Sequence, residues 1–138
     1  MADQVRKVNY AYVLVSNRPG QGEKVLDAIR RSGIDLLAFS GFPAGGGKAQ
    51  LDLVAARLGP IRSIARKNGW RLSEVKKGFV VQGGDRVGAV HGHLKKLADA
   101  GIGVRAADAV SAGKGRYGMI LWVKPRDYPR AANVLKAK

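Results

Sequence analysis

The chain contains one stretch of sequence twice. The first copy is VSNRPGQGEKVLDAIRRSGIDLLAF, residues 15–39, and the second is GGDRVGAVHGHLKKLADAGIGVRAA, residues 83–107. With an offset of 68 positions, identical residues coincide without a gap; the pairs include Arg18 with Arg86, Gly20 with Gly88, Leu26 with Leu94, Gly33 with Gly101, Ile34 with Ile102 and Ala38 with Ala106. A repeat at a fixed offset indicates one supersecondary unit that is used twice.

The order of elements within the unit can be predicted from the first copy. Residues 9–16 are rich in aromatic and β-branched side chains, which is typical of a strand. After a turn, Val25, Leu26 and Ile29 recur at helical spacing. A second helix is expected to begin at Gly59. Three further strands are predicted at residues 34–42, 49–55 and 70–75.

The second copy repeats this order. Helices are predicted at residues 86–100 and 129–136, and strands at residues 79–82, 102–110 and 117–123. The unit is β-α-β-β-α-β, the ferredoxin-like arrangement. We therefore expect an α+β fold of two tandem ferredoxin-like units packed side by side, made of residues 1–75 and 76–138.

One strand is missing from the second copy. By the same offset Lys138 corresponds to Trp70, so the second unit ends before its last strand. The edge of the strand at residues 79–82 would then be unpaired, which is unfavourable. Either residues 70–75 or a partner chain would have to cover it, and on this ground we predict a homodimer.

Composition excludes several classes of function. The chain has 138 residues and no cysteine, which excludes disulfides, thiol catalysis and cysteine-ligated zinc and fits a cytoplasmic protein. No stretch is apolar and long enough to cross a membrane, and we expect no secretory signal. Twenty-five Lys and Arg oppose ten Asp and Glu, a net charge of +15. Such a charge attracts polyanions, although it is also typical of a solubilising surface in a basic proteome.

The repeat resembles a known family. Residues 83–123 resemble an ACT domain over their whole length, with DRVG at 85–88, LADAGIGV at 97–104 and GKGRYGMILWV at 113–123. The first copy supplies NRPG at 17–20, which is similar to the loop of the serine-sensing ACT domain in some phosphoglycerate dehydrogenases, and SGIDL at 32–36. The resemblance covers roughly residues 7–138 and implies a free-standing tandem ACT protein with no enzyme domain attached.

The resemblance also implies a function. ACT domains typically pair side by side and bind amino acids or other small ligands where the loop after strand one meets strand two of the neighbouring unit. It therefore implies a non-catalytic regulatory protein with a small-molecule ligand, an amino acid, and with no cofactor, metal or membrane. The implied binding residues lie in the two loops and at the two strand-two positions: Asn17, Arg18, Pro19, Gly20, Asp85, Arg86, Val87, Gly88, Asp35 and Gly103.

The chemistry of the loops suits a zwitterion. The first turn of a helix has unpaired N–H groups and partial positive charge, which attract a carboxylate. Asn17 or Asp85 can accept a hydrogen bond from an ammonium group. If Asp85 faces Asp35, that site attracts the ammonium more strongly than the site of Asn17 and Gly103. Because Asn, Asp, Pro and Gly are also common cap and turn residues, the loops alone leave a purely structural role open.

Other chemistries are weaker alternatives. His91 and His93 are the only histidines, and at this spacing on a helix they cannot chelate one metal. Nucleic-acid binding is the main rival, because ferredoxin-like sheets include RNA-recognition motifs. KGF at 77–79 begins like their aromatic signature but lacks its later aromatics. The basic residues Arg57, Arg62, Arg66, Lys67, Arg71, Lys76 and Lys77, opposed only by Glu74, form either a solvated helix face or a polyanion-binding surface.

Overall fold

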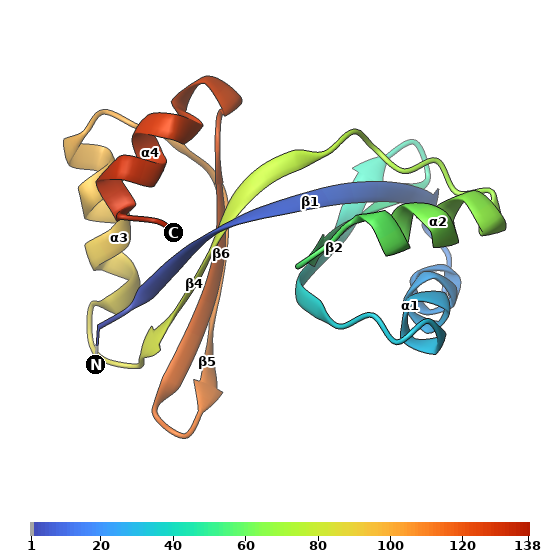
Figure 1. Cartoon of the computed structure of the whole chain (residues 1–138), viewed down its shortest axis with the longest axis horizontal. Coiled ribbons are helices and arrows are strands. Elements are labelled where there is room, and N and C mark those ends of the chain that lie inside the picture. The colour runs from blue at the N-terminus through green and yellow to red at the C-terminus, as the bar shows by residue number, and fades with distance from the viewer. Residues whose placement is uncertain (1) are drawn as a thin grey trace. The chain divides into compact units, whose positions relative to one another are not determined.

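The computed structural model describes residues 2–138, which divide into two compact units (Figure 1). One unit consists of residues 9–76. The other consists of residues 77–138 together with residues 2–8. Each unit carries two helices and a sheet of antiparallel strands in the expected order, so the α+β fold of two ferredoxin-like units is confirmed. None of the helices within residues 2–138 has the length and apolar character needed to span a membrane.

The unit of residues 9–76 is formed by the second half of β1 (Gln4–Ser16) and by α1 (Gln21–Arg31), β2 (Leu36–Gly45), β3 (Lys48–Ala55) and α2 (Gly59–Asn68). Its strand order is β2-β3-β1, and both pairings are antiparallel. The two helices pack on one face of the sheet, because alternate strand residues and one stripe of each helix are apolar. The buried core consists of Val13, Val25, Ala28, Ile29, Leu51, Leu53, Ala55, Ile61 and Ile64.

The predicted strand at residues 70–75 is reduced to a single bridge. Leu72 pairs with Val13, and the Ser73 backbone N–H donates to the Tyr12 carbonyl oxygen at 2.8 Å. The Tyr12 N–H, however, donates to the Ser73 side-chain oxygen at 2.8 Å. Because a hydroxyl occupies the place of a backbone carbonyl, the ladder of backbone hydrogen bonds does not continue. The prediction of a regular strand here was wrong.

The second unit contains β4 (Lys76–Gly84), α3 (Ala89–Asp99), β5 (Val104–Gly113), β6 (Arg116–Val123) and α4 (Tyr128–Leu135), with a short 3₁₀ turn before α4. Both β4 and β5 pair with β6 in antiparallel register. Figure 1 shows α3 and α4 on one side of these strands. The core between them includes Phe79, Leu97, Met119, Leu121, Ala131 and Leu135, and the Phe79 ring stacks on Tyr128 with centroids 4.5 Å apart.

The strand missing from the second copy is supplied by the beginning of the chain. The first half of β1 lies beside β4, Val5 belongs to the same core as Phe79, and the Lys138 N–H donates to the Val5 carbonyl oxygen at 2.9 Å. Neither residues 70–75 nor a partner chain is needed at this edge, so our expectation was wrong on this point. The unpaired edge therefore no longer argues for a homodimer. The two compact units differ from the expected residues 1–75 and 76–138 in the placement of residues 2–8 and of Lys76.

Backbone geometry repeats with the sequence. The Asn17 N–H donates to the Gly47 carbonyl oxygen, and the Asp85 N–H donates to that of Gly115, both at 2.8 Å. Two residues after the end of the helix that follows each loop stands a glycine with positive φ, 73° at Gly33 and 72° at Gly101. This left-handed conformation closes a helix and is strained for other residues. The residues that are identical in the two copies at these positions therefore reflect a turn geometry that the copies share.

One carboxyl group is buried in the sheet of the first unit. Asp52 on β3 is 5% exposed, and its Oδ1 accepts a hydrogen bond from Gln50 Nε2 at 2.9 Å. Burial raises the pKa of Asp52, and this outweighs the opposing effects of Gln50 and the charge of Lys76. Ionised Asp52 is thus less favourable in the folded state than in the unfolded chain.

We expect Asp52→Asn to increase stability at neutral pH by about 1 kcal/mol. Because the folded pKa of Asp52 is raised, the stability of the wild-type protein is highest, with respect to this group, below the ordinary pKa of 3.8. That stability is lost as the pH rises through the folded pKa and Asp52 ionises. The asparagine keeps the acceptor for Gln50 but carries no charge. The check is urea unfolding of both proteins between about pH 4 and 8; a stability difference that does not grow with pH would contradict the prediction.

Candidate functional site

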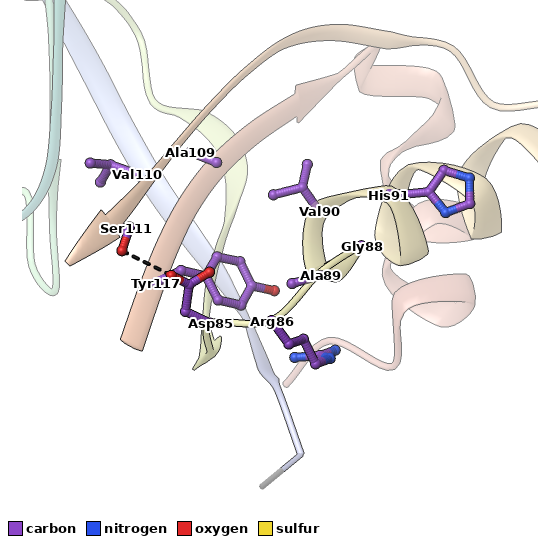
Figure 2. A pocket seen from close by; sticks show the side chains of 10 residues that line it. All are labelled: Asp85, Arg86, Gly88, Ala89, Val90, His91, Ala109, Val110, Ser111 and Tyr117. Atoms are coloured by element: carbon purple, nitrogen blue, oxygen red, sulfur yellow. Dashed lines mark hydrogen bonds between the residues drawn. The ribbon is translucent and has the colours of Figure 1, made fainter. Parts of the chain in front are cut away.

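A pocket of about 280 Å³ lies at the start of α3 (Figure 2). Its walls are the loop between β4 and α3, the first turn of α3, part of β5 and one residue of β6. All of the lining residues belong to the second unit: Asp85, Arg86, Gly88, Ala89, Val90, His91, Ala109, Val110, Ser111 and Tyr117. The volume is near the lower end of the range for small-molecule sites, which suits a ligand of amino-acid size.

The helix end at the pocket has no side-chain cap. Gly88 precedes α3 with φ of 80°, and no side chain accepts a hydrogen bond from the first turn. The first-turn residues Ala89, Val90 and His91 line the pocket. Helix N-terminal N–H groups without a cap partner carry partial positive charge, so an anionic group is stabilised there.

A carboxylate lies beside this helix end. The Asp85 backbone N–H donates to the Gly115 carbonyl oxygen at 2.8 Å, which fixes the residue at the end of the hairpin. Its Oδ2 accepts a hydrogen bond from the Ser111 hydroxyl at 2.9 Å, drawn as the dashed line in Figure 2. The carboxylate therefore has a defined orientation on the pocket wall. A positive group and a negative group can thus be bound within the same small volume.

A buried cluster lies against the pocket and fixes two of its residues. The Asp3 carboxylate accepts hydrogen bonds from the Tyr117 hydroxyl at 2.6 Å and from Arg86 Nη1 and Nη2 at 3.1 and 3.3 Å. His93 Nε2 lies 2.7 Å from the same carboxylate and 3.1 Å from the Tyr117 hydroxyl oxygen. The Asp3 side chain is only 6% exposed. The start of the chain is thereby joined to both α3 and β6.

The cluster shifts two pKa values in opposite directions. Burial by itself would raise the pKa of Asp3, but hydrogen bonds from Arg86, Tyr117 and His93 hold that pKa well below its usual range. Burial, together with the hydrogen bond to Asp3, raises the pKa of Tyr117. At neutral pH Asp3 is therefore ionised and Tyr117 is a protonated donor. The Arg86 guanidinium also donates to the Gly84 carbonyl oxygen at 2.8 Å, so it is held by this cluster.

The predicted binding residues divide into three groups. Asp85, Arg86 and Gly88 line the pocket, whereas the Val87 side chain is fully exposed. Asn17, Arg18, Pro19 and Gly20 form the exposed loop between β1 and α1, where Arg18 Nε donates to the Ser16 hydroxyl at 3.0 Å. Asp35 and Gly103 are exposed in the loops before β2 and β5 and do not line this pocket.

Sequence reasoning missed Asp3, Tyr117 and Ser111. Tyr117 and Ser111 belong to predicted strands or their hairpin, but nothing in the sequence indicates which strand residues reach the loop. Asp3 lies outside every predicted element, so no pattern identifies its partners. The sequence predicts a surface or packing role for His93 and does not indicate its contact with Asp3. Among residues 2–138, no group of three or more His, Cys, Asp or Glu side chains is placed to hold a metal ion.

Comparison with known proteins supports the fold. No family model and no curated protein matches the sequence. The structure of protein BT0572 from Bacteroides thetaiotaomicron is 14% identical with a TM-score of 0.78, covering 97% of this chain and 88% of that one. The regulatory subunit of aspartate kinase from Thermus flavus is 15% identical with a TM-score of 0.60, covering 98% and 94%.

A longer chain also matches over part of its length. Aspartate kinase from Synechocystis is 15% identical with a TM-score of 0.62, and the match covers 99% of this chain but 27% of that one. The fold of two tandem ferredoxin-like units predicted from the repeat is thus confirmed by its likeness to these structures. In the regulatory subunit from Thermus flavus, the matched fold covers 94% of the chain.

Proposed function

We propose that the protein is a non-catalytic regulatory protein that binds a free amino acid in the pocket at the start of α3. The observation that carries the proposal is that the uncapped N-terminus of α3 and the Asp85 residue line the same pocket of about 280 Å³. An α-amino acid carries one negative and one positive group on the same carbon atom. The likeness to regulatory subunits of aspartate kinase supports a regulatory role.

In the proposed complex, the ligand carboxylate accepts hydrogen bonds from N–H groups of the first turn of α3. The ligand ammonium donates to the Asp85 carboxylate, which Ser111 orients. The ligand side chain lies against Val90, Val110 and Tyr117. Gly88, which has no side chain, leaves room for the ligand at the backbone, since a Cβ there would meet no atom within 4 Å.

The first copy supplies a second candidate loop. Asn17, Arg18, Pro19 and Gly20 are its counterpart of Asp85 to Gly88, with an amide in place of the carboxylate. A neutral acceptor binds an ammonium group more weakly than a carboxylate does. We therefore propose Asp85 as the main ammonium partner. Roles for Asp35 and Gly103, a homodimeric state and a cytoplasmic location stay predictions from the sequence.

The test is a thermal-shift screen of the standard amino acids at millimolar concentration. A ligand that binds only the folded state adds about 2.7 kcal/mol of stability at a hundred times its dissociation constant. We expect one amino acid, or a small chemically related group, to raise the melting temperature. Calorimetry then gives the affinity. A flat response to every amino acid at concentrations up to about 10 mM would argue against the proposal.

Asp85→Ala is expected to weaken the binding of that amino acid about ten- to a hundredfold. The reason is the loss of a charge-assisted hydrogen bond, about 1.5–3 kcal/mol. Asp108→Ala is the matched control, because Asp108 is an exposed aspartate on β5 that does not line the pocket. Calorimetric titration of both variants distinguishes the outcomes. Equal affinities would mean that the ammonium group is not bound by Asp85.

A further inference from the structure

Helix α2 differs from the other helices in the pairing of its charges. In α1, Asp27 pairs with Arg30 at 2.7 Å and with Arg31 at 3.0 Å. In α3, Lys95 pairs with Asp99 at 2.8 Å, and in α4 Arg130 lies 3.8 Å from Asp127 at its start. Each of these helices therefore has at least one basic residue paired with an acid that lies in the helix or directly before it, three or four positions away.

No such acid is present in α2. The helix and its flanks carry five basic residues that we call the α2 surface: Arg57, Arg62, Arg66, Lys67 and Arg71. No Asp or Glu occurs from residue 57 to residue 73, and within residues 2–138 none of the five forms an ion pair. Arg62 and Arg66, four positions apart, lie on one stripe of the helix. The α2 surface is thus a local excess of five positive charges.

The other face of α2 limits the kind of partner. Ile61 and Ile64 belong to the core of the first unit, and Ala65 is also buried. An interfacial helix inserts its apolar face into the lipid, but that face of α2 is occupied by the protein's own core. A protein partner would be expected to bury aromatic or large apolar residues at the centre of the contact. The exposed part of α2 carries no large apolar side chain.

The residue types favour phosphate. Four of the five cations are arginines, whose planar guanidinium groups donate two parallel hydrogen bonds to a phosphate. We propose that the α2 surface binds the phosphate backbone of nucleic acid without sequence preference. Contacts to phosphates set affinity and orientation and carry no sequence information. This site shares no residue with the pocket at α3, so the two proposals stand or fall separately.

The test uses a fluorescein-labelled DNA duplex of about 20 base pairs and mixed sequence, followed by anisotropy between about 50 and 200 mM salt. The variant is Arg62→Gln combined with Arg66→Gln. The matched control is Arg30→Gln combined with Arg31→Gln, which removes the same two charges from α1, where Asp27 already pairs with them. Circular dichroism and thermal unfolding establish that both double variants are folded.

We expect wild type to bind the duplex, with an affinity that falls steeply as salt rises. Loss of two phosphate contacts should reduce the slope of log affinity against log salt by about 2 and weaken binding roughly tenfold or more at about 100 mM salt. The control should retain nearly the wild-type slope. Equal losses in the two double variants would overturn the proposal, because the effect would then come from net charge. No binding of the duplex by wild type at the lowest salt would also overturn it.

Discussion

Replacing Asp3 with alanine is expected to lower the free energy of unfolding by about 3 kcal/mol and the melting temperature by roughly 10 °C. The carboxylate is buried and accepts hydrogen bonds from Tyr117 and Arg86, with His93 at 2.7 Å. Without it, the buried Tyr117 hydroxyl and the buried His93 ring lose their shared partner, and each such loss costs about 1–3 kcal/mol. Urea and thermal unfolding of the variant give the measurement.

Asp99→Ala is the control for this loss. Asp99 also pairs with a basic residue, Lys95, but that pair is exposed on α3 and is expected to contribute less than about 1 kcal/mol. Asp3 also gives a pH signature. Because its folded pKa is lowered, its contribution is present above the ordinary value of 3.8 and is lost as the pH falls further. If Asp3→Ala and Asp99→Ala cost the same, the Asp3 cluster does not stabilise the second unit.

Gly83→Ala is expected to destabilise the protein by at least about 2 kcal/mol. Gly83 lies on β4 beneath Asp3, and a Cβ at this position would overlap the Asp3 carboxylate and lie 3.1 Å from the Tyr117 ring. The added methyl group must therefore displace the beginning of β1 or the tyrosine. Gly84→Ala is the matched control, since a Cβ there meets nothing within 4 Å and the change should stay within about 0.5 kcal/mol.

Thermal unfolding of the two alanine variants, measured side by side, decides the question. Both changes add one methyl group to the same strand, so strand propensity affects them alike. A double variant with Asp3→Ala adds a further distinction. If the clash with the carboxylate is the cause, Gly83→Ala should cost less in the Asp3→Ala background than in wild type. Equal stability of the two single variants would mean that β1 shifts freely at this point.

The sequence predicts most of the fold because the repeat can be checked against itself. Loop and turn positions such as Gly33 and Gly101 require the same positive φ in both copies, so the two copies support one assignment. The prediction failed at both ends of the predicted unit of residues 1–75. Val5 and Val8 are three positions apart, so they fall on opposite faces of a strand and give no alternation on one face. At residues 70–75 the Ser73 side chain replaces a backbone acceptor, which no periodicity reveals.

The candidate site was predictable only in part. The loop Asp85 to Gly88 could be located because its turn chemistry recurs at Asn17 to Gly20. The opposite wall of the pocket could not be located from the sequence. Ser111 lies 2.9 Å from Asp85 because of the register in which β5 pairs, and the sequence does not reveal that register. The pairing of Arg86 with a buried carboxylate could not be predicted from the sequence either. Its partner Asp3 is 83 positions away, and only the folded chain brings the two together.

The division of β1 between the two units has a consequence for the order in which the protein can fold. Residues 4–8 leave the ribosome long before β4 and β6, which are the strands of their own unit. Residues 9–76, in contrast, are contiguous and have all of their core partners as soon as they are made. The second unit must therefore close a loop of some seventy residues, which slows folding relative to local contacts. During synthesis, Asp3 therefore has no hydrogen-bond partner from its cluster until Arg86, His93 and Tyr117 have been made.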